Sequence, residues 1–325
     1  MTAQLIKAEK REVVTCEGIF GESLIERFAK FAGVSESSRK TYIKCLRQLL
    51  KHFQNNSIIA PTRENLVEWI DELKAAGKSA STIQLYLTAT KIFFRWLAQE
   101  NIFPNIADHL KSGIKPSHKH KKDALTTDQC AELVRNCKVF SKINKVHNEV
   151  AELRDKAILS LMVTAGLRTI EVVRANIGDI RFERGKIFLY VQGKGHDDAD
   201  EKVLLAKQTY KAIQAYLNLR GKAQASDPLF VSTSRSNFGK RLSTQSISKL
   251  VKRELRANGL DSVRLTAHSL RHSAATNLIY AGIELPKVQM IMRHKSLSTT
   301  MIYAHSWQRY QNDGEQMLAD DIFGH

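Results

Sequence analysis

The stretch Thr266–His305, TAHSLRHSAATNLIYAGIELPKVQMIMRHKSLSTTMIYAH, decides how the rest of the chain is interpreted. It places His268 and Arg271 three residues apart at the start of an apolar-periodic segment. His294 follows a second such segment, and Tyr303 comes nine residues later. Histidine and arginine suit a phosphate group and tyrosine can act as a nucleophile, but each is also an ordinary surface residue. The remaining sequence must therefore supply the other groups that such a site needs.

Composition makes a large polyanion the natural partner. The 325 residues carry 50 Lys and Arg against 33 Asp and Glu, a formal charge of +17, and the basic excess occurs in both halves. This length suits two domains, each with its own core. Nucleic acid is the first partner to consider, although a merely soluble basic protein would show the same charge.

Several classes of protein are disfavoured by the sequence. The cysteines at positions 16, 45, 130 and 137 lack CxxC spacing, so we expect reduced thiols without disulfide or structural zinc. No window approaches the roughly 18 apolar residues of a membrane span, and the N-terminus lacks the apolar core of a signal peptide. We therefore expect a soluble cytoplasmic protein with no membrane partner.

Helical periodicity predicts a four-helix module over residues 20–104, after an N-terminal tail of residues 1–19. In the second helix, apolar residues between Tyr42 and Phe53 recur at i, i+4, i+7, i+8 and i+11. The remaining positions of this helix are strongly basic, and a solvated charged face would look the same. The residues that we expect to contact a phosphate backbone are Arg39, Lys40, Lys44 and Arg47.

Residues 105–123 resemble a basic interdomain linker without a helical stripe. We expect this segment to lie along the polyanion with Lys119 as one contact, and an inert solvated linker is the alternative. His118 and His120 have lysines as neighbours and no Cys or carboxylate at ligand spacing, so we predict no metal site there.

The sequence also predicts no nucleotide cofactor. Ala76–Ser79 reads AGKS, like the end of a phosphate-binding loop, but the earlier glycine that such a loop requires falls at Glu72. No buried strand precedes this segment either. We therefore assign no ATP site.

The sequence pattern of residues 124–305 predicts a second domain that contains both helices and strands. A helix begins after Thr126, and the largely apolar segment 148–165 is typical of a central core helix. From Asp179 the period changes to two, which predicts three short antiparallel strands before helices return at 207–220 and 244–258. The expected fold class is therefore mainly α with a small antiparallel β-sheet.

A DNA phosphodiester would make use of the polar residues in this domain. Two arginines, Arg168 and Arg271, can supply planar donors to the non-bridging oxygens, as lysine cannot. Attack by a tyrosine conserves the bond energy in a covalent phosphotyrosine, so that no ATP is required. A lysine on a mobile turn could protonate the leaving 5′ oxygen, and histidines can donate to the developing charge. Lys194 stands between glycines in a predicted turn, although plain solvation would explain such a lysine equally well. A metal is dispensable where arginines neutralise the phosphate.

With these residues placed, the sequence resembles the tyrosine recombinases, or phage integrase family, over nearly its whole length. The matching motifs are AGLRTIE, QGKG, HSLRH, MRHKSLSTT and MIYAH. The resemblance implies a SAM-like core-binding domain at 20–104 and an α+β catalytic domain at 124–305. It also implies these roles: Tyr303 as nucleophile, Lys194 as general acid, Arg168 and Arg271 as phosphate clamp, His268 as general base or proton shuttle, His294 as transition-state donor, and Glu171 as the acid that orients the site.

The chain departs from the family pattern at two places. Arg293 stands where the family usually has glycine, so either the local turn differs or Arg293 contacts DNA. The turn after Lys194 reads GHDDADEK, longer and more acidic than the usual basic hairpin, which leaves Lys202 as the alternative general acid.

The resemblance implies site-specific strand exchange through a 3′-phosphotyrosine, without ATP or metal. The absence of a separate arm-binding domain suggests a simple recombinase, similar to the Xer proteins or Cre. The implied partners are duplex DNA with paired core sites, a second protomer on each site, a tetramer in the synapse, and accessory or directionality proteins. Residues 306–325 form an acidic, partly apolar tail suited to docking on a neighbouring protomer. The alternatives are a type IB topoisomerase and a non-catalytic DNA-binding accessory protein.

Overall fold

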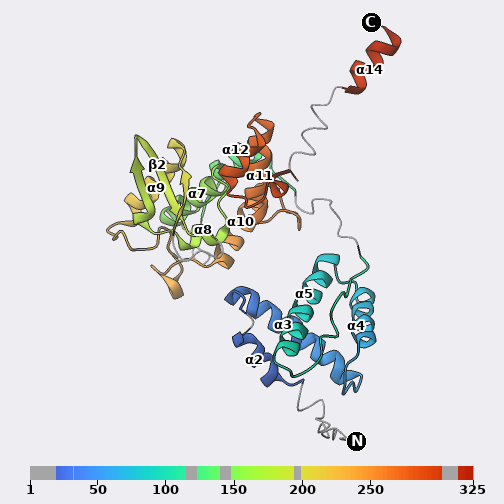
Figure 1. Cartoon of the computed structure of the whole chain (residues 1–325). Helices are drawn as coiled ribbons and strands as arrows, with labels where there is room; N and C mark the ends of the chain where they lie inside the picture. Colours follow the sequence, from blue (N-terminus) through green and yellow to red (C-terminus); the bar gives the residue numbers. More distant parts are fainter. Residues whose placement is uncertain are drawn as a thin grey trace, which may run out of the picture. The chain divides into compact units, whose positions relative to one another are not determined.

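The computed structural model describes residues 20–31, 33–114, 123–139, 148–193, 199–301 and 314–324. The chain divides into two compact units, Met1–Lys119 and His120–His325, each with a hydrophobic core of its own (Figure 1). No helix within the described ranges combines the length and the apolar composition that a bilayer crossing requires.

The first unit contains the four helices expected from the periodicity. They are α2 (Glu22–Phe31), α3 (Glu36–Asn55), α4 (Arg63–Ala75) and α5 (Ala80–Gln99). The side chains of Ser35 and Ser79 accept hydrogen bonds from backbone amides three residues later, so the starts of α3 and α5 are capped by short polar side chains. The apolar stripe of each helix faces a common core, whose fully buried members include Phe28, Leu46, Phe53, Leu66, Leu87 and Phe94.

The second unit is mainly helical with one small sheet, which confirms the expected fold class. Its helices are α6 (Thr127–Arg135), α7 (Glu149–Thr164), α8 (Thr169–Arg174), α9 (Lys207–Arg220), α10 (Thr244–Ala257), α11 (Ala267–Tyr280), α12 (Leu285–Met292) and α14 (Gly314–Phe323). Two single-turn helices, η1 (Ile177–Asp179) and η2 (Arg235–Asn237), lie within its loops. The predicted helices at 207–220 and 244–258 therefore match α9 and α10 within one residue.

The sheet is antiparallel in the order β1 (Ile180–Glu183), β2 (Lys186–Val191), β3 (Glu201–Leu204). Glu183 pairs with Lys186 across a two-residue turn in which Arg184 and Gly185 both have positive φ, the geometry of a tight hairpin that matches strand twist. On one face of β2 and β3, Leu189, Val191 and Val203 are buried toward the core. The sheet thus obeys the alternation that the sequence predicted.

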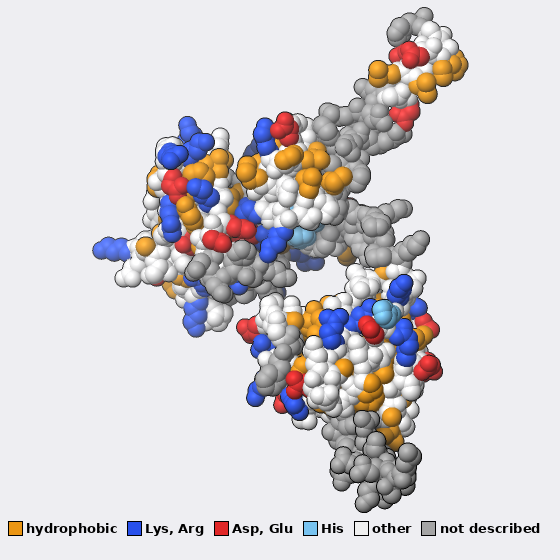
Figure 2. All heavy atoms as spheres, in the orientation of Figure 1, with side chains coloured by type: hydrophobic (Ala, Val, Ile, Leu, Met, Phe, Trp, Pro, Cys, Tyr) orange, Lys and Arg blue, Asp and Glu red, His pale blue; other side chains and the backbone are white. Residues whose placement is uncertain are grey.

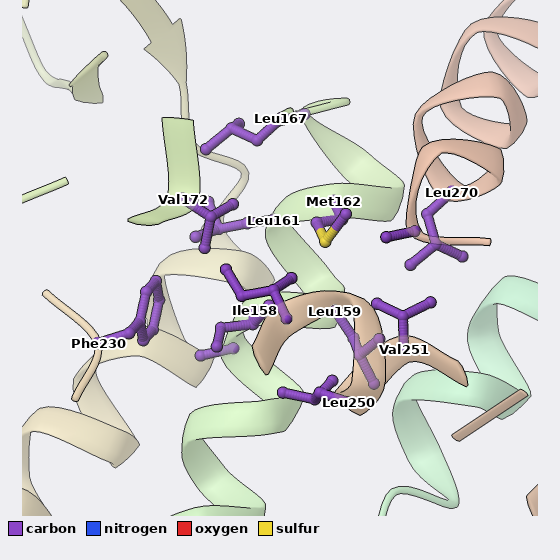
Figure 3. Packing of buried hydrophobic residues seen from close by; sticks show 14 of the residues in the cluster. Ile158, Leu159, Leu161, Met162, Leu167, Val172, Phe230, Leu250, Val251 and Leu270 are labelled. Atoms are coloured by element: carbon purple, nitrogen blue, oxygen red, sulfur yellow. The ribbon is translucent and has the colours of Figure 1, made fainter. Parts of the chain in front are cut away.

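Helix α7 is the centre of the second unit. It packs against α6, α9 and α11, which explains why its sequence is apolar over most of its circumference (Figure 1). Ile158, Leu159, Leu161 and Met162 are completely buried, and Figure 3 shows them meeting side chains from α8, α10 and α11. Full burial of such side chains stabilises a fold by about 1.5–3 kcal/mol each.

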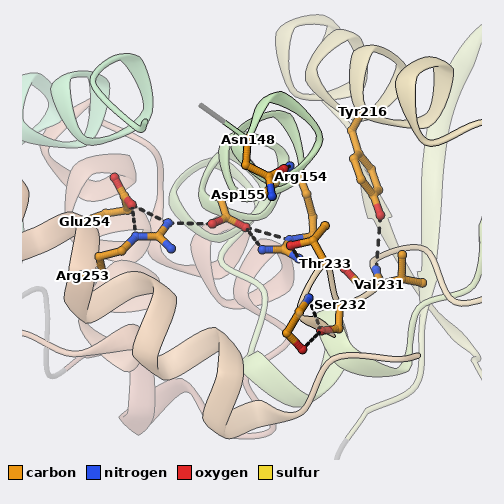
Figure 4. Close-up of polar contacts among 11 residues, drawn as sticks. Asn148, Arg154, Asp155, Tyr216, Val231, Ser232, Thr233, Arg253 and Glu254 are labelled. Carbon is orange, nitrogen blue, oxygen red and sulfur yellow. Dashed lines mark hydrogen bonds and ion pairs between the residues drawn. The ribbon is translucent and has the colours of Figure 1, made fainter. Parts of the chain in front are cut away.

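A buried polar network joins α7 to α10 (Figure 4). Asp155, with no exposed surface, accepts from Arg154 Nε at 2.8 Å and from Arg253 Nη2 at 2.6 Å. Arg154 also donates to the carbonyl of Val231 at 2.9 Å. Arg253 donates in turn to Glu254, the next residue on α10, at 2.6 Å. One carboxylate therefore fixes α10 and the 231–233 loop on the central helix.

We expect Asp155→Ala to destabilise the second unit by about 3–5 kcal/mol, because it leaves Arg154 buried without its counter-charge. Arg253→Ala should cost less, since the Arg253 side chain is 44% exposed and its loss leaves Asp155 paired with Arg154. Glu254 also loses Arg253, but burial already raises the pKa of this carboxyl, so that it can become neutral by binding a proton. The measurement is urea-dependent alkylation of the buried thiols of Cys130 and Cys137, followed by mass spectrometry.

Cys45, buried in the first unit, serves as the internal control in the same samples. Its protection should be unchanged in both variants. Equal destabilisation by the two substitutions, or a parallel loss of Cys45 protection, would contradict the assignment of this network to the second unit.

Candidate active site

Arg168 is placed by the sharp turn that ends the central helix. Gly166 lies in this turn with φ +58°, and a Cβ added there would lie 2.5 Å from Cε and 2.7 Å from Sδ of Met292. Glycine adopts this left-handed conformation without strain, and any larger residue would also force the end of the Met292 side chain to move. Arg168 then forms the N-cap of α8, so rigid elements hold its backbone on both sides.

Glu171, one helical turn after Arg168, is a fully buried carboxylate that holds two guanidinium groups. Its Oε1 accepts from Arg168 Nη1 at 2.5 Å, and its Oε2 accepts from the Arg168 amide and from Arg293 Nη2, both at 2.8 Å. Burial opposes ionisation of this group, but Arg293 and Arg168 outweigh burial and hold the pKa of Glu171 below its ordinary value. The carboxylate therefore stays charged and fixes the orientation of Arg168.

Arg271 is 3% exposed and is held by backbone carbonyls. Its Nη1 donates to the carbonyl of Gly166 at 2.5 Å, and its Nη2 donates to the carbonyl of Met292. Arg168 Nη2 donates to the next carbonyl, that of Arg293, at 3.2 Å. The C-terminal end of α12 thus receives both arginines, and its partial negative charge favours them there.

His268 completes this side of the site. It lies in the first turn of α11 with an exposed side chain, and its ring makes an edge contact with His272 at 4.4 Å between centroids. Arg168, His268 and Arg271 all line one cavity of about 820 Å³. The structure therefore brings together three of the residues that the sequence singled out.

Two further basic residues line the same cavity and were missed by sequence reasoning. Lys252 and Arg256 are four residues apart on α10, and both pair with Asp261, at 2.7 and 3.1 Å respectively. Their i, i+4 spacing on an amphipathic helix was the available signal, but the sequence does not show which end of α10 meets the site.

His294 is half-buried directly after the α12 turn. Its Nδ1 lies 2.9 Å from the hydroxyl of Thr300, which is completely buried. Burial, together with the charges of Arg271, Arg168, Arg293 and His268, lowers the pKa of His294 to about 4. In the DNA-free protein this imidazole is therefore neutral at physiological pH.

Lys202, the alternative general acid, lies on β3 and lines a second cavity of about 460 Å³ together with His294 and Arg293. Its Nζ pairs with Glu183 at 3.0 Å and lies 5.0 Å above the ring of Phe188. The hydrogen bond that Lys202 donates to Glu183 raises the pKa of Lys202, which makes it a weaker acid than an unpaired lysine.

Arg293 was expected as a DNA contact, and its burial does not fit that expectation. The side chain is 7% exposed and turns inward to Glu171. Two of the basic residues of α3 differ in this respect. Lys40 and Arg47 are well exposed although each pairs with a neighbouring glutamate, Glu36 and Glu22 respectively.

Three predicted site residues lie outside the described residues. They are Lys119, Lys194 and Tyr303. Their flanks are described: β2 ends at Val191, β3 begins at Glu201, and Met301 precedes the tyrosine by two residues. Within the described ranges, no cluster of three or more His, Cys, Asp or Glu side chains could hold a metal ion.

Comparison with known families identifies both units. Residues 123–309 match the model of the phage integrase family, and residues 24–101 match that of the phage integrase N-terminal SAM-like domain. The first match alone covers more than half of the chain. The chain belongs to the phage integrase family, the tyrosine recombinases.

Individual relatives agree with this membership. A tyrosine recombinase XerA of Pyrococcus furiosus is 30% identical, over 93% of this chain and 96% of the relative. A tyrosine recombinase XerC of Alcanivorax borkumensis is 32% identical, over 72% of this chain and 71% of the relative. The protein is therefore a DNA breaking–rejoining enzyme that carries out site-specific recombination.

Solved structures share the fold. A XerH site-specific recombinase bound to palindromic difH substrate has a TM-score of 0.70 at 22% identity, over 92% of this chain and 84% of that one. A lambda integrase dimer bound to a COC′ core site has a TM-score of 0.63 at 16% identity, over 88% and 97%. At these identities the likeness concerns the fold alone.

We expect His294 to titrate near pH 4 in the DNA-free protein, far below its ordinary value of 6.5. Between these two pH values the unfolded chain binds a proton that the folded chain does not, so the free energy of unfolding should fall as pH drops through this window. NMR of ¹³C-labelled histidine measures the midpoint directly.

His294→Gln identifies the resonance among the 11 histidines, because only that signal should disappear from the spectrum. A midpoint at or above 6.5 for that signal would show that the imidazole is not held neutral by its surroundings.

Proposed function

We propose that the chain exchanges DNA strands through a covalent 3′-phosphotyrosine formed by Tyr303. The observation that carries this proposal is the pairing of Arg168 and Arg271 in one cavity with His268. The two guanidinium groups are held by adjacent carbonyls of one helix end and line the same cavity, and planar groups of this kind suit the non-bridging oxygens of a phosphodiester. Tyr303 follows His294 by nine residues in the sequence, which supports its role as the nucleophile of this site.

The proposed reaction has two symmetric steps, and each step exchanges one phosphoester bond for another. The phenolic oxygen of Tyr303 attacks phosphorus, the bond to the 5′ oxygen breaks, and Lys194 supplies the proton to that leaving group. His268 accepts the proton of the tyrosine, directly or through water, and His294 donates to a non-bridging oxygen. A 5′-hydroxyl from the partner strand then reverses the sequence and releases Tyr303. Because one phosphoester replaces another, no ATP is consumed.

Lys194 is preferred to Lys202 as the acid. Lys202 is paired with Glu183, and this pairing raises its pKa away from physiological pH. Lys194 stands between two glycines in the sequence that connects β2 to β3, and the resemblance to the family assigns the acid to this position. We infer that Glu171 acts only by orienting Arg168.

We propose that residues 20–104 and 124–305 bind the same duplex, with 105–123 as the basic linker and 1–19 as a tail. Arg39, Lys40, Lys44, Arg47 and Lys119 are the proposed contacts to phosphate outside the active site. We place this activity in the cytoplasm, with a dimer on each core site, a tetramer in the synapse, and accessory or directionality proteins as further partners. The names of the relatives favour recombination over a topoisomerase or an accessory protein.

Tyr303→Phe should abolish the covalent adduct while retaining DNA binding, because it removes only the nucleophilic oxygen. Core sites are first selected from a randomised duplex pool with the wild-type chain and then nicked beside the scissile phosphate, so that the cleaved fragment diffuses away. Denaturing gels measure the adduct and fluorescence anisotropy measures binding.

Arg168→Ala serves as a second variant and should reduce the adduct by about 10²-fold or more, as losing a transition-state donor does. An adduct that persists in Tyr303→Phe would assign the nucleophile elsewhere. Binding by the wild-type chain without any adduct would support the accessory alternative.

The end of the chain supports assembly of several protomers. Met317, Leu318, Ile322 and Phe323 on α14 are between 59% and 83% exposed, and Figure 2 shows hydrophobic side chains gathered on this helix. Such a cluster on a short helix is unfavourable in water and suits burial against protein. We propose that residues 306–325 dock on a neighbouring protomer.

Deletion of residues 312–325 should therefore weaken cooperative binding to a paired core site and leave binding to a half-site unchanged. Titrations of both DNAs with the intact and shortened chains provide the comparison. Met317→Ser with Phe323→Ser is the matched point variant and should behave like the deletion. Unchanged cooperativity in both would exclude docking in trans.

A further inference from the structure

Arg293 adopts a backbone conformation that glycine would adopt with less strain. It is the C-cap of α12, with φ 52° and ψ 47°, in the left-handed region. Helices commonly end on such a residue, and it is usually glycine because a Cβ is unfavourable there. An arginine at this position therefore indicates that its side chain contributes something that offsets the strain.

The side chain of Arg293 connects three elements. Its Nη2 donates to Glu171 of α8 at 2.8 Å, and its Nη1 donates to the carbonyl of Ile291 in α12 at 2.9 Å. Its Nε faces Oε2 of Glu201, the first residue of β3, at 3.6 Å. Arg293 Nε and Glu201 Oε2 are both buried without a hydrogen bond. The attraction between these two opposite charges is therefore what compensates each of them for its burial. The guanidinium is thus directed inward.

Arg293 interacts with Arg168 both directly and through Glu171. Its carbonyl accepts from Arg168 Nη2 at 3.2 Å, and its guanidinium shares the Glu171 carboxylate with Arg168. A carboxylate held from two sides cannot rotate away from Arg168. The turn that carries His294 is fixed by the same interactions, because His294 is the next residue.

We propose that Arg293 is a positioning residue, which fixes Arg168 through Glu171 and joins the α12 turn to strand β3. This inference rests on the proposed role of Arg168 in phosphate binding. Arg293 acts through the other residues and makes no contact with DNA. Strand β3 follows the segment that contains Lys194, the proposed acid. The contact between Arg293 and Glu201 therefore connects this strand to the α12 turn and to Arg168.

The proposal predicts that loss of the Arg293 guanidinium will lower the rate of DNA cleavage but not the affinity for DNA. Without the guanidinium, Oε2 of Glu171 keeps only the amide of Arg168, and Glu201 loses its only nearby cation among the contacts described above. Arg168 would remain charged and close to the phosphate but would lose its fixed orientation. Binding, which depends on charge, should persist, whereas cleavage, which depends on orientation, should slow.

The chain itself supplies a matched control. Arg184 also has a left-handed backbone, with φ 47°, but it is exposed in the β1–β2 turn. Arg293→Gly and Arg184→Gly therefore make the same chemical change, with the same loss of charge and the same relief of backbone strain. Only the first removes the link to Glu171.

The experiment compares Arg293→Gly, Arg293→Lys and Arg184→Gly on the nicked core sites selected with the wild-type chain. Single-turnover formation of the Tyr303 adduct at saturating DNA gives the rate, and anisotropy titration gives the affinity. Arg293→Gly should slow the adduct by about 10–100-fold, as loss of a supporting partner does at other sites. Arg293→Lys should recover part of the rate, and Arg184→Gly should match the wild type. Alkylation of Cys130 and Cys137 checks that each variant is folded.

Three results would overturn the inference. Equal rates for Arg293→Gly and Arg184→Gly would show that the link does not position Arg168. A loss of affinity that equals the loss of rate, with a smaller salt dependence of binding, would make Arg293 a direct phosphate contact instead. Absence of any adduct with the wild-type chain would remove the proposed function itself, and this inference with it.

Discussion

The buried carboxylate of Glu171 is the interaction on which the rest of the site depends. An isolated charge without solvent exposure would be strongly unfavourable, so this group must be paired by guanidinium groups and by a backbone amide. Those partners come from α8 and from the end of α12, two elements separated by more than a hundred residues of sequence. The requirement to neutralise one carboxylate therefore brings Arg168 and the His294 turn to the same place.

The end of α12 supplies the second constraint. Its last carbonyls have no partner within the helix and accept instead from Arg168 and Arg271. Each guanidinium has five N–H donors in a rigid plane, so orientation by a carbonyl leaves other donors for a phosphate. In their proposed role, both arginines are thus oriented before DNA binds, so that little reorganisation would remain at the moment of reaction. The same cluster of cations determines the protonation state of His294. Their combined charge and the burial of the side chain keep its imidazole neutral.

Periodicity was sufficient to predict most of the fold. The apolar stripes and alternating strands are local properties, and α3, α7, α9 and the three short antiparallel strands appear where the sequence predicted them. The neighbours of the site residues were not predictable, because they depend on tertiary packing. The sequence alone left Arg293 free to contact DNA, whereas the structure buries it on Glu171. Lys252 and Arg256 were overlooked because nothing local shows which face of α10 meets the cavity.

Helix α10 shows why fold and chemistry cannot be separated in the second unit. Lys252 and Arg256 face the cavity that contains Arg168 and Arg271, whereas Arg253, between them in sequence, reaches Asp155 on α7. The rotation of α10 about its axis is therefore set by a contact that lies away from the cavity. The same central helix ends at the Gly166 turn that places Arg168. Because residues 157–162 of α7, between these two points, are all buried, any displacement of α10 relative to Arg168 and Arg271 must deform the core, and a close-packed core resists such deformation. The geometry of the site is thus a consequence of how its central helix is buried.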